Sequence, residues 1–162
     1  MMTILNNKIV QIWTDGGCRN NPGEGGIGIV MKYKEAVKEI NGYIQHTTNN
    51  QMELLALIVA IKQLKKHCNL QIMLDSQYVK NGITLWIKKW KLNNWKSSHK
   101  QPIKNKKLWL ELDNLISQHN VSFVWVKGHS GDKENELADY LCNKAMDTKM
   151  PQLNEYLHLL SD

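Results

Sequence analysis

The feature of this sequence that most restricts its fold is a helical segment that is apolar on almost every side. Thr48 followed by Gln51 fits a capping box, which predicts that a helix begins near Asn49. Residues 52–64 then carry apolar side chains on nearly all faces of that helix. A surface helix keeps one polar face, and this segment has almost none. We therefore expect the helix to be buried beneath other elements of the fold.

The segments around this helix predict a mixed sheet. Strands are expected at residues 8–14, 27–33, 36–44, 70–74 and 121–126. Further helices are expected at residues 76–89, with Ser76 as the cap, 106–119 and 134–146. Residues 15–26 are expected to form a loop, and residues 91–104 a basic loop or a broken helix. Three strands followed by alternating helices and strands indicate an α/β protein whose sheet has an antiparallel and a parallel side. With 162 residues, we expect one domain over residues 1–147 and a short tail over 148–162.

Composition excludes several classes of protein. The chain is 42% apolar and 22% charged, which is ordinary for a soluble globular protein. No apolar run approaches the roughly 20 residues of a membrane span, and the N-terminus lacks a signal-peptide core. Cys18, Cys68 and Cys142 are far apart and form no CxxC pair, which argues against a zinc site or a disulfide framework. We expect reduced thiols in a cytoplasmic protein.

A basic stretch interleaved with tryptophans indicates contact with nucleic acid. The formal charge of the chain is +6, and no acidic residue lies between Asp75 and Glu111. That stretch holds nine of the 21 Lys and Arg residues and four of the six tryptophans. Lysines among aromatic rings suit a phosphate backbone with stacked sugars or bases. The alternative is a solvated helix face whose tryptophans turn into the core, and we favour that alternative for Trp109.

Four carboxylates occupy positions that are typical of a functional site. Asp15 and Asp75 each directly follow a predicted strand, where open α/β sheets place their ligands. Glu53 lies in the first turn of the buried helix, where an unpaired charge is costly, and Asp139 lies inside the last helix. Each has a simpler explanation: Asp15 could start a turn, Asp75 could cap a helix, Glu53 could favour the helix dipole and Asp139 could be a surface residue.

Taken together, the four acids fit a metal site better than four separate structural roles. Carboxylates that converge at the end of a sheet repel one another, and a divalent cation removes that repulsion. Magnesium prefers oxygen ligands and keeps waters for substrate phosphates. Two such ions can stabilise both the attacking and the leaving oxygen in a phosphoryl displacement. An acidic metal site beside a basic, aromatic surface therefore predicts a nuclease.

Four segments of the chain resemble type 1 ribonuclease H in its compact bacterial form. They are TDGGCRNNPGEGG around Asp15, TTNNQMELLA around Glu53, DSQYVKNGITLWIKKW from Asp75, and VKGHSGDKENELAD ending at Asp139. The segments come in the family's order and cover the chain to about Ala145. The resemblance implies the ribonuclease H-like three-layer fold, with a five-stranded mixed sheet in the order 3-2-1-4-5 and helices on both faces.

The resemblance also implies an activity. A protein of this family is an endoribonuclease that hydrolyses the RNA strand of RNA–DNA hybrids by a two-metal mechanism, leaving 5'-phosphate and 3'-hydroxyl ends. Asp15, Glu53, Asp75 and Asp139 are then the ligands of two Mg2+ ions that act with the substrate, and Mn2+ is a possible replacement. His129, between two glycines in VKGHSG, would assist proton transfer and product release from a mobile loop. Histidine suits this role because its pKa lies near neutral pH.

The resemblance also implies which residues contact the substrate, although some of them have an alternative structural role. The positions implied to touch the RNA strand or read the minor groove are Cys18, Asn21, Asn50 and Gln77. Those implied to hold a phosphate of the DNA strand or line its channel are Thr48, Asn49 and Asn105. Trp86 would pack on DNA sugars, and residues 90–107, with Lys91, Trp95, Lys96 and Lys100, would form a basic protrusion that grips the duplex. The alternatives are turn or helix-start roles for Asn21 and Gln77, a cap for Thr48 and burial for Trp86.

The chain departs from the family at some positions, and two other functions share part of this sequence pattern. His46 stands where many members have an arginine beside the phosphate pocket, so the grip there is expected to be weaker or pH-sensitive. We expect no separate N-terminal hybrid-binding module, no obligate protein partner and a monomer. A junction resolvase or integrase-like enzyme would share the acids but not the basic protrusion. A binding module without catalysis would have no reason to keep Glu53 in a costly position.

Overall fold

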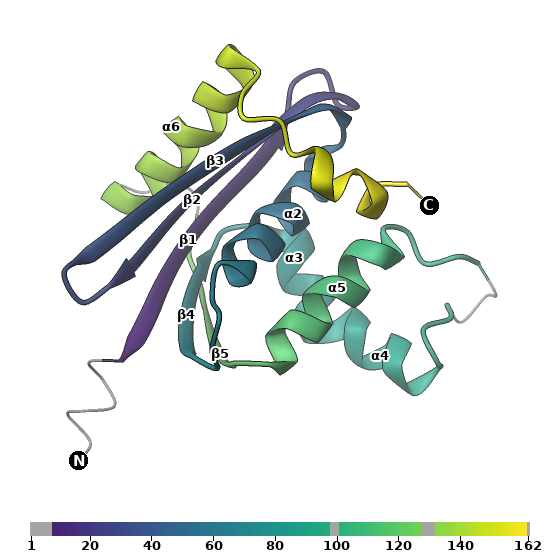
Figure 1. Ribbon diagram of the computed structural model, residues 1–162. Helices are drawn as coiled ribbons and strands as arrows, with labels where there is room; N and C mark the ends of the chain where they lie inside the picture. The colour runs from purple at the N-terminus through teal and green to yellow at the C-terminus, as the bar shows by residue number, and fades with distance from the viewer. Residues whose placement is uncertain (1–7, 98–100, 128–131, 162) are drawn as a thin grey trace.

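The computed structural model describes residues 8–97, 101–127 and 132–161, and it shows a sheet between two layers of helices (Figure 1). The strands are β1 (Ile9–Cys18), β2 (Gly23–Tyr33), β3 (Ala36–Thr47), β4 (Asn69–Leu74) and β5 (Asn120–Trp125). They form a five-stranded sheet in the order β3-β2-β1-β4-β5. β1, β2 and β3 pair antiparallel, whereas β4 pairs parallel with both β1 and β5. The predicted fold class and strand order are therefore confirmed.

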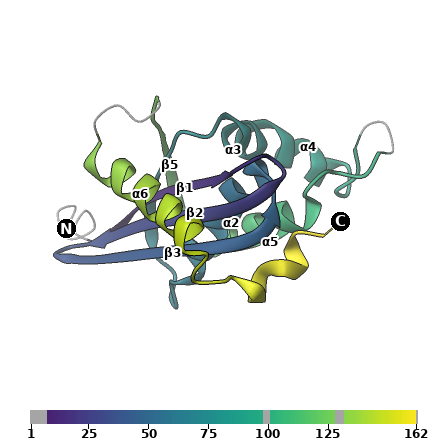
Figure 2. The same cartoon turned by 90° about the horizontal axis from the view of Figure 1, so that it is seen from above.

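Helices cover both faces of this sheet. They are α2 (Asn49–Lys62), α3 (Gln77–Asn81), the π-helical turn η1 (Gly82–Trp86), α4 (Ile87–Leu92), α5 (Lys106–Ser117), α6 (Lys133–Thr148) and the 3-10 helix η2 (Asn154–Leu159). α6 lies across β1, β2 and β3 on one face (Figure 2). α2 packs on β1 and β2 from the other side and is itself covered by α5.

The apolar helix is buried, as its sequence predicts. In α2, Met52 and the residues from Leu54 to Ile61 are at most 3% exposed. Thr48 is the N-cap, and its side chain accepts a hydrogen bond from the backbone N–H of Gln51. Only this half of the predicted capping box forms, because the Gln51 side chain bonds to other residues instead. The sheet on one side and α5 on the other supply the cover that an all-apolar helix needs.

The predicted loop over residues 15–26 is largely wrong, because β1 runs to Cys18 and β2 begins at Gly23. Asp15 therefore lies inside β1, opposite Gly28 of β2, and does not follow the strand. Two glycines of β2, Gly26 and Gly28, allow α6 to pack closely on the sheet. A Cβ added to Gly28 would lie 1.9 Å from the backbone oxygen of Ala138. Glycine is needed there because no side chain fits between strand and helix.

Other helix boundaries differ modestly from the predicted ones. The helix capped by Ser76 continues through η1 and α4 to Leu92, beyond the predicted end at residue 89. A Cβ on Gly82 would lie 1.9 Å from the ring of Trp109, so glycine at this position lets the tryptophan pack against the helix. α5 ends at Ser117, two residues earlier than predicted, and α6 extends from Lys133 to Thr148.

The predicted tail is packed against the domain. Leu153 is 7% exposed and Leu159 is 8% exposed, and both belong to the main hydrophobic core. A domain boundary at residue 147 stays a prediction, but the residues after it contribute to the same core. Among the described residues, no helix is long and apolar enough to cross a membrane.

Candidate active site

The four acids come from four different elements and meet at one end of the sheet. Asp75 directly follows β4, the parallel neighbour of the β1 strand that carries Asp15. Glu53 lies in the first turn of α2, and with these two aspartates it lines a small hollow at the strand ends. Asp139 reaches the same place from α6, where its carboxyl is within hydrogen-bonding reach of Asp15. The structure thus brings together all four predicted metal ligands.

The surroundings of these acids disfavour their charged forms. Burial raises the pKa of Asp15 to about 8, and the hydrogen bond and negative charge of Asp139 and the charge of Asp75 act in the same direction. Burial also raises the pKa of Glu53, with a further contribution from Asp75, while a hydrogen bond from the Ser76 hydroxyl acts in the opposite direction. A divalent cation would remove this repulsion, because it favours the ionised form of every carboxylate around it.

The donor set fits magnesium. All four predicted ligands are carboxylates, which are hard oxygen donors. In the described part of the chain, no three His, Cys, Asp or Glu side chains are already grouped closely enough to hold an ion by themselves. Magnesium does not require such a cage, because it usually binds one or two carboxylates and completes its shell with waters and substrate phosphates.

Two residues beside the acids were not predicted as part of the site. Ser76 was predicted only as a helix cap, and its hydroxyl also donates to Oε2 of Glu53. Asn143 lies one turn after Asp139 on α6, and its Nδ2 donates to Oδ1 of Asp139 over 3.3 Å. The i, i+4 spacing on a helix could have indicated the second contact, whereas no local signal indicates the first. Both side chains orient carboxylates of the site.

Cys142 also borders the site but is not a nucleophile. It is buried on α6, and burial together with the charges of Asp15 and Asp139 raises the pKa of its thiol to about 12. A thiol with such a pKa stays protonated at neutral pH and acts as a small apolar residue.

Three of the four residues implied to touch the RNA strand, Cys18, Asn21 and Asn50, lie around the start of α2. The backbone N–H of Cys18 donates to Oδ1 of Asn49 over 2.7 Å, and the Asn49 N–H donates to Oδ1 of Asn21 over 3.2 Å. These bonds tie the β1–β2 connection to α2. Asn50 is half-buried in the same turn. Gln77 is exposed at the start of α3, and its amide donates to Asn81.

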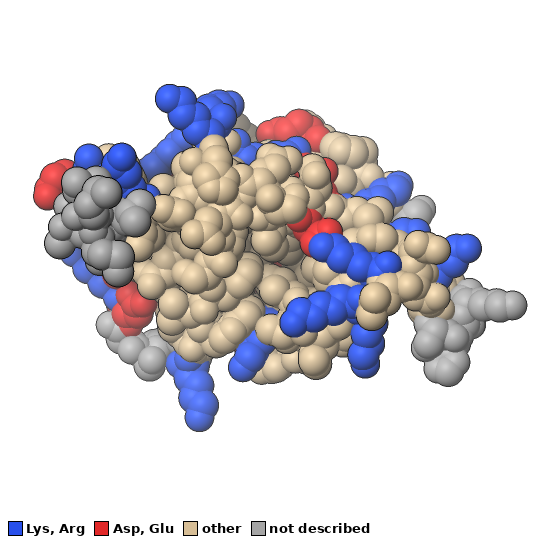
Figure 3. Space-filling model, turned by 90° about the horizontal axis from the view of Figure 1, so that it is seen from below, with Lys and Arg blue, Asp and Glu red and all other residues tan. Residues whose placement is uncertain are grey.

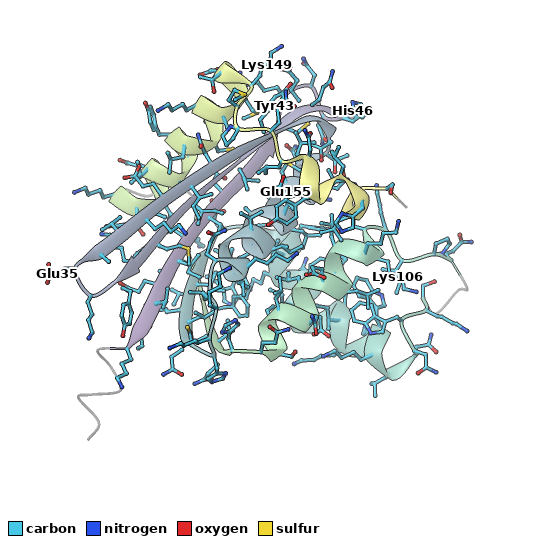
Figure 4. All side chains as sticks on the ribbon, viewed as in Figure 1. Glu35, Tyr43, His46, Lys106, Lys149 and Glu155 are labelled. Atoms are coloured by element: carbon cyan, nitrogen blue, oxygen red, sulfur yellow. The ribbon has the colours of Figure 1, made fainter. Side chains whose placement is uncertain are left out.

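The residues implied to hold a DNA phosphate are also close together. Thr48 and Asn105 are both linked to Gln51: the Thr48 hydroxyl accepts from its backbone N–H, and Oδ1 of Asn105 accepts from its side-chain Nε2 over 3.4 Å. Asn105 is only 5% exposed, and its Nδ2 donates to the Tyr78 hydroxyl over 3.1 Å. His46 is exposed on β3, two residues before Thr48 (Figure 4).

The tryptophans of the basic stretch pack mainly against one another. Their rings and that of Tyr78 form a continuous cluster with neighbouring centroids 5.4–6.2 Å apart, made of Tyr78, Trp86, Trp90, Trp95 and Trp109. Trp109 is fully buried, as predicted, and the other three tryptophans are half-buried. Part of the surface of each tryptophan, including Trp86 and Trp95, is therefore buried against the other rings. Contact of Trp86 and Trp95 with the substrate stays a prediction.

The described lysines between residues 88 and 107 are exposed. Basic side chains lie over the end of the molecule that holds α4 and α5, and others lie at the opposite end (Figure 3). Lys91 pairs with Asp113 over 2.9 Å, which offsets part of its charge, whereas Lys96 is exposed. Lys96, Lys104, Lys106 and Lys107 line a hollow with Trp95 in its wall. Two predicted site residues, Lys100 and His129, lie outside the described residues.

Comparison with known proteins agrees with this geometry. The family model for RNase H matches residues 7–147 of the chain. The chain belongs to the ribonuclease H family. It is 53% identical over 138 residues to Ribonuclease H of Hydrogenovibrio crunogenus (strain DSM 25203 / XCL-2), covering 85% of this chain and 95% of that protein. It has the same identity and coverage with Ribonuclease HI of Neisseria meningitidis serogroup B (strain ATCC BAA-335 / MC58).

Solved ribonuclease H structures share the fold. LC9-RNase H1, a type 1 RNase H with the type 2 active-site motif, superposes with a TM-score of 0.79 at 27% identity, over 88% of this chain and 74% of that one. RNase H1 of the halophilic archaeon Halobacterium salinarum NRC-1 superposes with a TM-score of 0.66 at 26% identity, over 86% of this chain and 98% of that one. The resemblance to bacterial type 1 ribonuclease H is confirmed, and the protein is a nuclease of the ribonuclease H class, which cleaves RNA strands in hybrids.

Proposed function

We propose that the protein is an endoribonuclease that hydrolyses the RNA strand of RNA–DNA hybrids with two Mg2+ ions, leaving 5'-phosphate and 3'-hydroxyl ends. The observation that carries this proposal is the meeting of four carboxylates from β1, α2, β4 and α6 at the strand ends. Without a cation the charged form of Asp15 is disfavoured, because burial and the neighbouring carboxylates raise its pKa to about 8. Such a site is suited to metal-assisted phosphodiester hydrolysis.

The chain's own residues hold and orient the reacting groups. Asp15, Glu53, Asp75 and Asp139 would hold the two ions, which when bound supply positive charge at the phosphate and a more acidic water. The Ser76 hydroxyl and the Asn143 amide keep the carboxylates of Glu53 and Asp139 in place.

His129 would exchange protons with the substrate or with water, because an imidazole changes charge near neutral pH. This role is a proposal from the VKGHSG segment alone, since the residue lies outside the described part of the chain.

Recognition of the hybrid is divided between two sets of residues. Amides of Asn21, Asn50 and Gln77 would read the minor groove, where the 2'-hydroxyl distinguishes RNA from DNA. Thr48, Asn49 and Asn105 would hold a phosphate of the DNA strand. The Thr48 hydroxyl can serve this role while it caps α2, because a hydroxyl accepts one bond and donates another. The exposed lysines near α4 would add affinity without choosing the cleavage position.

The protein would act as a cytoplasmic monomer with no obligate protein partner. All four carboxylates belong to one chain, so a second copy is not needed to complete the site. The free thiols of Cys18, Cys68 and Cys142 suit a reducing compartment.

A cleavage assay on matched substrates tests the proposal. RNA–DNA, RNA–RNA, DNA–DNA and single-stranded RNA would each be incubated with Mg2+ and with EDTA. We expect Mg2+-dependent cutting of only the RNA strand in the hybrid, with 5'-phosphate ends on the products. Asp15→Asn should abolish cleavage but still bind the hybrid, whereas Glu35→Gln in the exposed β2–β3 turn should cut normally. Cutting in EDTA, or equal cutting of the other substrates, would overturn the proposal.

A further inference from the structure

The chain after α6 follows a defined path toward the start of α2. It leaves α6 beside Tyr43, crosses the edge of β3 and passes in front of α2, where Glu155 lies (Figures 1 and 4). Its backbone pairs with β3: the Tyr43 N–H donates to the Pro151 oxygen over 2.8 Å, and the Leu153 N–H donates to the Tyr43 oxygen over 3.0 Å. Residues 149–160 form this C-terminal segment.

Side chains fix the C-terminal segment at both ends. At its start, Lys149 pairs with Glu24 over 2.9 Å, and Glu24 also accepts from the Tyr43 hydroxyl over 2.7 Å. Leu153 fills the space above Gly42, where an added Cβ would lie 2.4 Å from the leucine side chain. At the far end, Leu159 is buried in the main core. The carbonyl of Leu160 is therefore held at a defined position.

That carbonyl is bonded to Gln51, a side chain that joins several elements. Nε2 of Gln51 donates to the Leu160 oxygen over 2.9 Å and to Oδ1 of Asn105 over 3.4 Å. Oε1 of Gln51 accepts from the hydroxyl of Thr47 over 2.8 Å. Both N–H groups and the oxygen of this amide are thus occupied, and the amide can satisfy all three bonds in only one orientation.

The orientation of Gln51 in turn sets that of Asn105. Because Gln51 donates to Oδ1 of Asn105, the Asn105 Nδ2 must point the other way, where it donates to the Tyr78 hydroxyl. Asn105 also has a left-handed backbone, with φ of 60°, at the N-cap of α5, and it is 5% exposed. A buried amide in such a position turns with its partners, since an unpaired polar group is costly there.

From these contacts we infer that the C-terminal segment positions the phosphate-binding residues Thr48 and Asn105, and that it acts through the side chain of Gln51. The backbone N–H of Gln51 bonds to the Thr48 hydroxyl while its amide bonds to Asn105, so one residue connects both to the segment. This inference rests on the proposed function, because the ligand is a phosphate of the DNA strand in a hybrid. Gln51 and the segment are positioning groups and do not touch the substrate.

Two variants remove the connection in different ways. Gln51→Met keeps the size of the side chain but loses all three side-chain bonds, and deletion of residues 158–162 removes the Leu160 carbonyl. Gln63→Met is the matched control, because this glutamine lies at the other end of α2 and bonds to Val59 and Lys38. Deletion of Asp162 alone is the control for chain length, since it keeps Leu160.

Hybrid binding would be measured in EDTA, and KM and kcat in Mg2+, at a temperature well below the unfolding midpoint of every variant. Loss of a positioning hydrogen bond should weaken metal-free binding about fivefold to tenfold and raise KM by a similar factor, with kcat within about twofold. The doubly changed protein should bind no more weakly than either single variant, because both changes break one connection. The two controls should match the unmodified protein.

A DNA-strand scan locates the effect. Replacing single DNA phosphates by neutral methylphosphonates should weaken binding by the unmodified protein at one position, and that sensitivity should be lost in Gln51→Met. If both variants only lower thermal stability and bind as tightly as the controls, the segment is merely a structural cover and the inference is overturned. Failure of the unmodified protein to bind or cut the hybrid would instead contradict the proposed function.

Discussion

At the scale of single residues, Asp15 should make the stability of the metal-free protein depend on pH. Its pKa in the folded protein is about 8, above its ordinary value of 3.8. A carboxyl with a raised folded pKa stabilises the fold at low pH, and this contribution is lost as the pH rises through about 8. Asp15→Asn removes the titrating carboxyl, so the variant should not lose this stability as the pH rises. In EDTA at pH 8.5 the variant should exceed the unmodified protein in stability by several kcal/mol, with little difference at pH 4.

Urea unfolding at the two pH values, with EDTA present, measures this difference. Glu35→Gln is the control, because Glu35 is exposed in a turn and should show no such pH dependence. Equal stability of Asp15→Asn and the unmodified protein at pH 8.5 would mean that burial and the neighbouring carboxylates do not disfavour the charged form of Asp15.

His129 should contribute less to catalysis than any of the acids. The residue is proposed to move protons, and a positioned proton-transfer group contributes about 100-fold to 10,000-fold. His129→Ala should therefore lower kcat by a factor in the lower part of this range and leave metal-free hybrid binding unchanged. Single-turnover cleavage gives the comparison with Asp15→Asn. A loss as complete as that of Asp15→Asn would contradict an auxiliary role.

At the scale of elements, the contact of α6 with the sheet controls where Asp139 lies. Gly28→Ala would place a Cβ 1.9 Å from the Ala138 oxygen, one residue before Asp139. The helix must shift to relieve this contact, which should cost about 2–3 kcal/mol and move Asp139 away from Asp15. Stability and kcat should fall together.

Gly17→Ala is the control for that substitution. An added Cβ at Gly17 meets no atom within 4 Å, although Gly17 lies on the same strand as Asp15. Thermal unfolding and cleavage rates of the two variants give the test. Similar losses at both positions would show that close packing of α6 is not what requires glycine.

The lysines around α4 should set affinity for the hybrid through counterion release. Changing Lys91, Lys96 and Lys100 together to glutamine should weaken binding and reduce the slope of log Kd against log salt by up to about 2.7, or 0.9 for each phosphate contact. Lys91 should contribute the least of the three, because Asp113 already pairs with it. Fluorescence anisotropy over a salt series measures the slope.

Lysines remote from α4 provide the comparison. Lys34, Lys38 and Lys66 lie at the opposite end of the sheet, near the β2–β3 turn and the end of α2. Replacing all three changes the net charge equally but should leave the salt slope nearly unchanged. If the two triple variants behave alike, the duplex does not lie along α4.

At the scale of the whole molecule, Mg2+ should stabilise the fold. Ligands that bind only the folded state add RT ln(1 + [L]/Kd), about 1.4 kcal/mol at tenfold excess over Kd. For a chain of this size that corresponds to a rise of about 3–6 °C in Tm. Differential scanning calorimetry at pH 8 with increasing Mg2+, in a buffer free of Ca2+, measures this rise. KCl of equal ionic strength is the control. No rise beyond that of KCl would mean that the four carboxylates do not bind the ion.

Much of the architecture follows from short-range patterns in the sequence. The burial of α2 and the caps at Thr48 and Ser76 agree with these predictions. The strand order also agrees, but it was predicted from the resemblance to a family. Periodicity and caps involve residues within a few positions of one another, so a single segment carries enough information to predict them. The four acids were found in the same way, through their places beside strands and in helices, and through segments that resemble a family.

Tertiary structure alone decided the remaining features, because they depend on partners far away in the chain. Gly16 is required on β1 because an added Cβ would lie 2.4 Å from the backbone oxygen of Met52 in α2, and Gly28 on β2 because α6 packs against it. The C-terminal segment joins the core, although nothing in its own residues predicted this. Gln51 bonds to residues 54 and 109 positions away, so its local role in a capping box could not reveal these contacts. The sequence determines which side chains are present and how each segment folds locally, and only packing determines which of them meet.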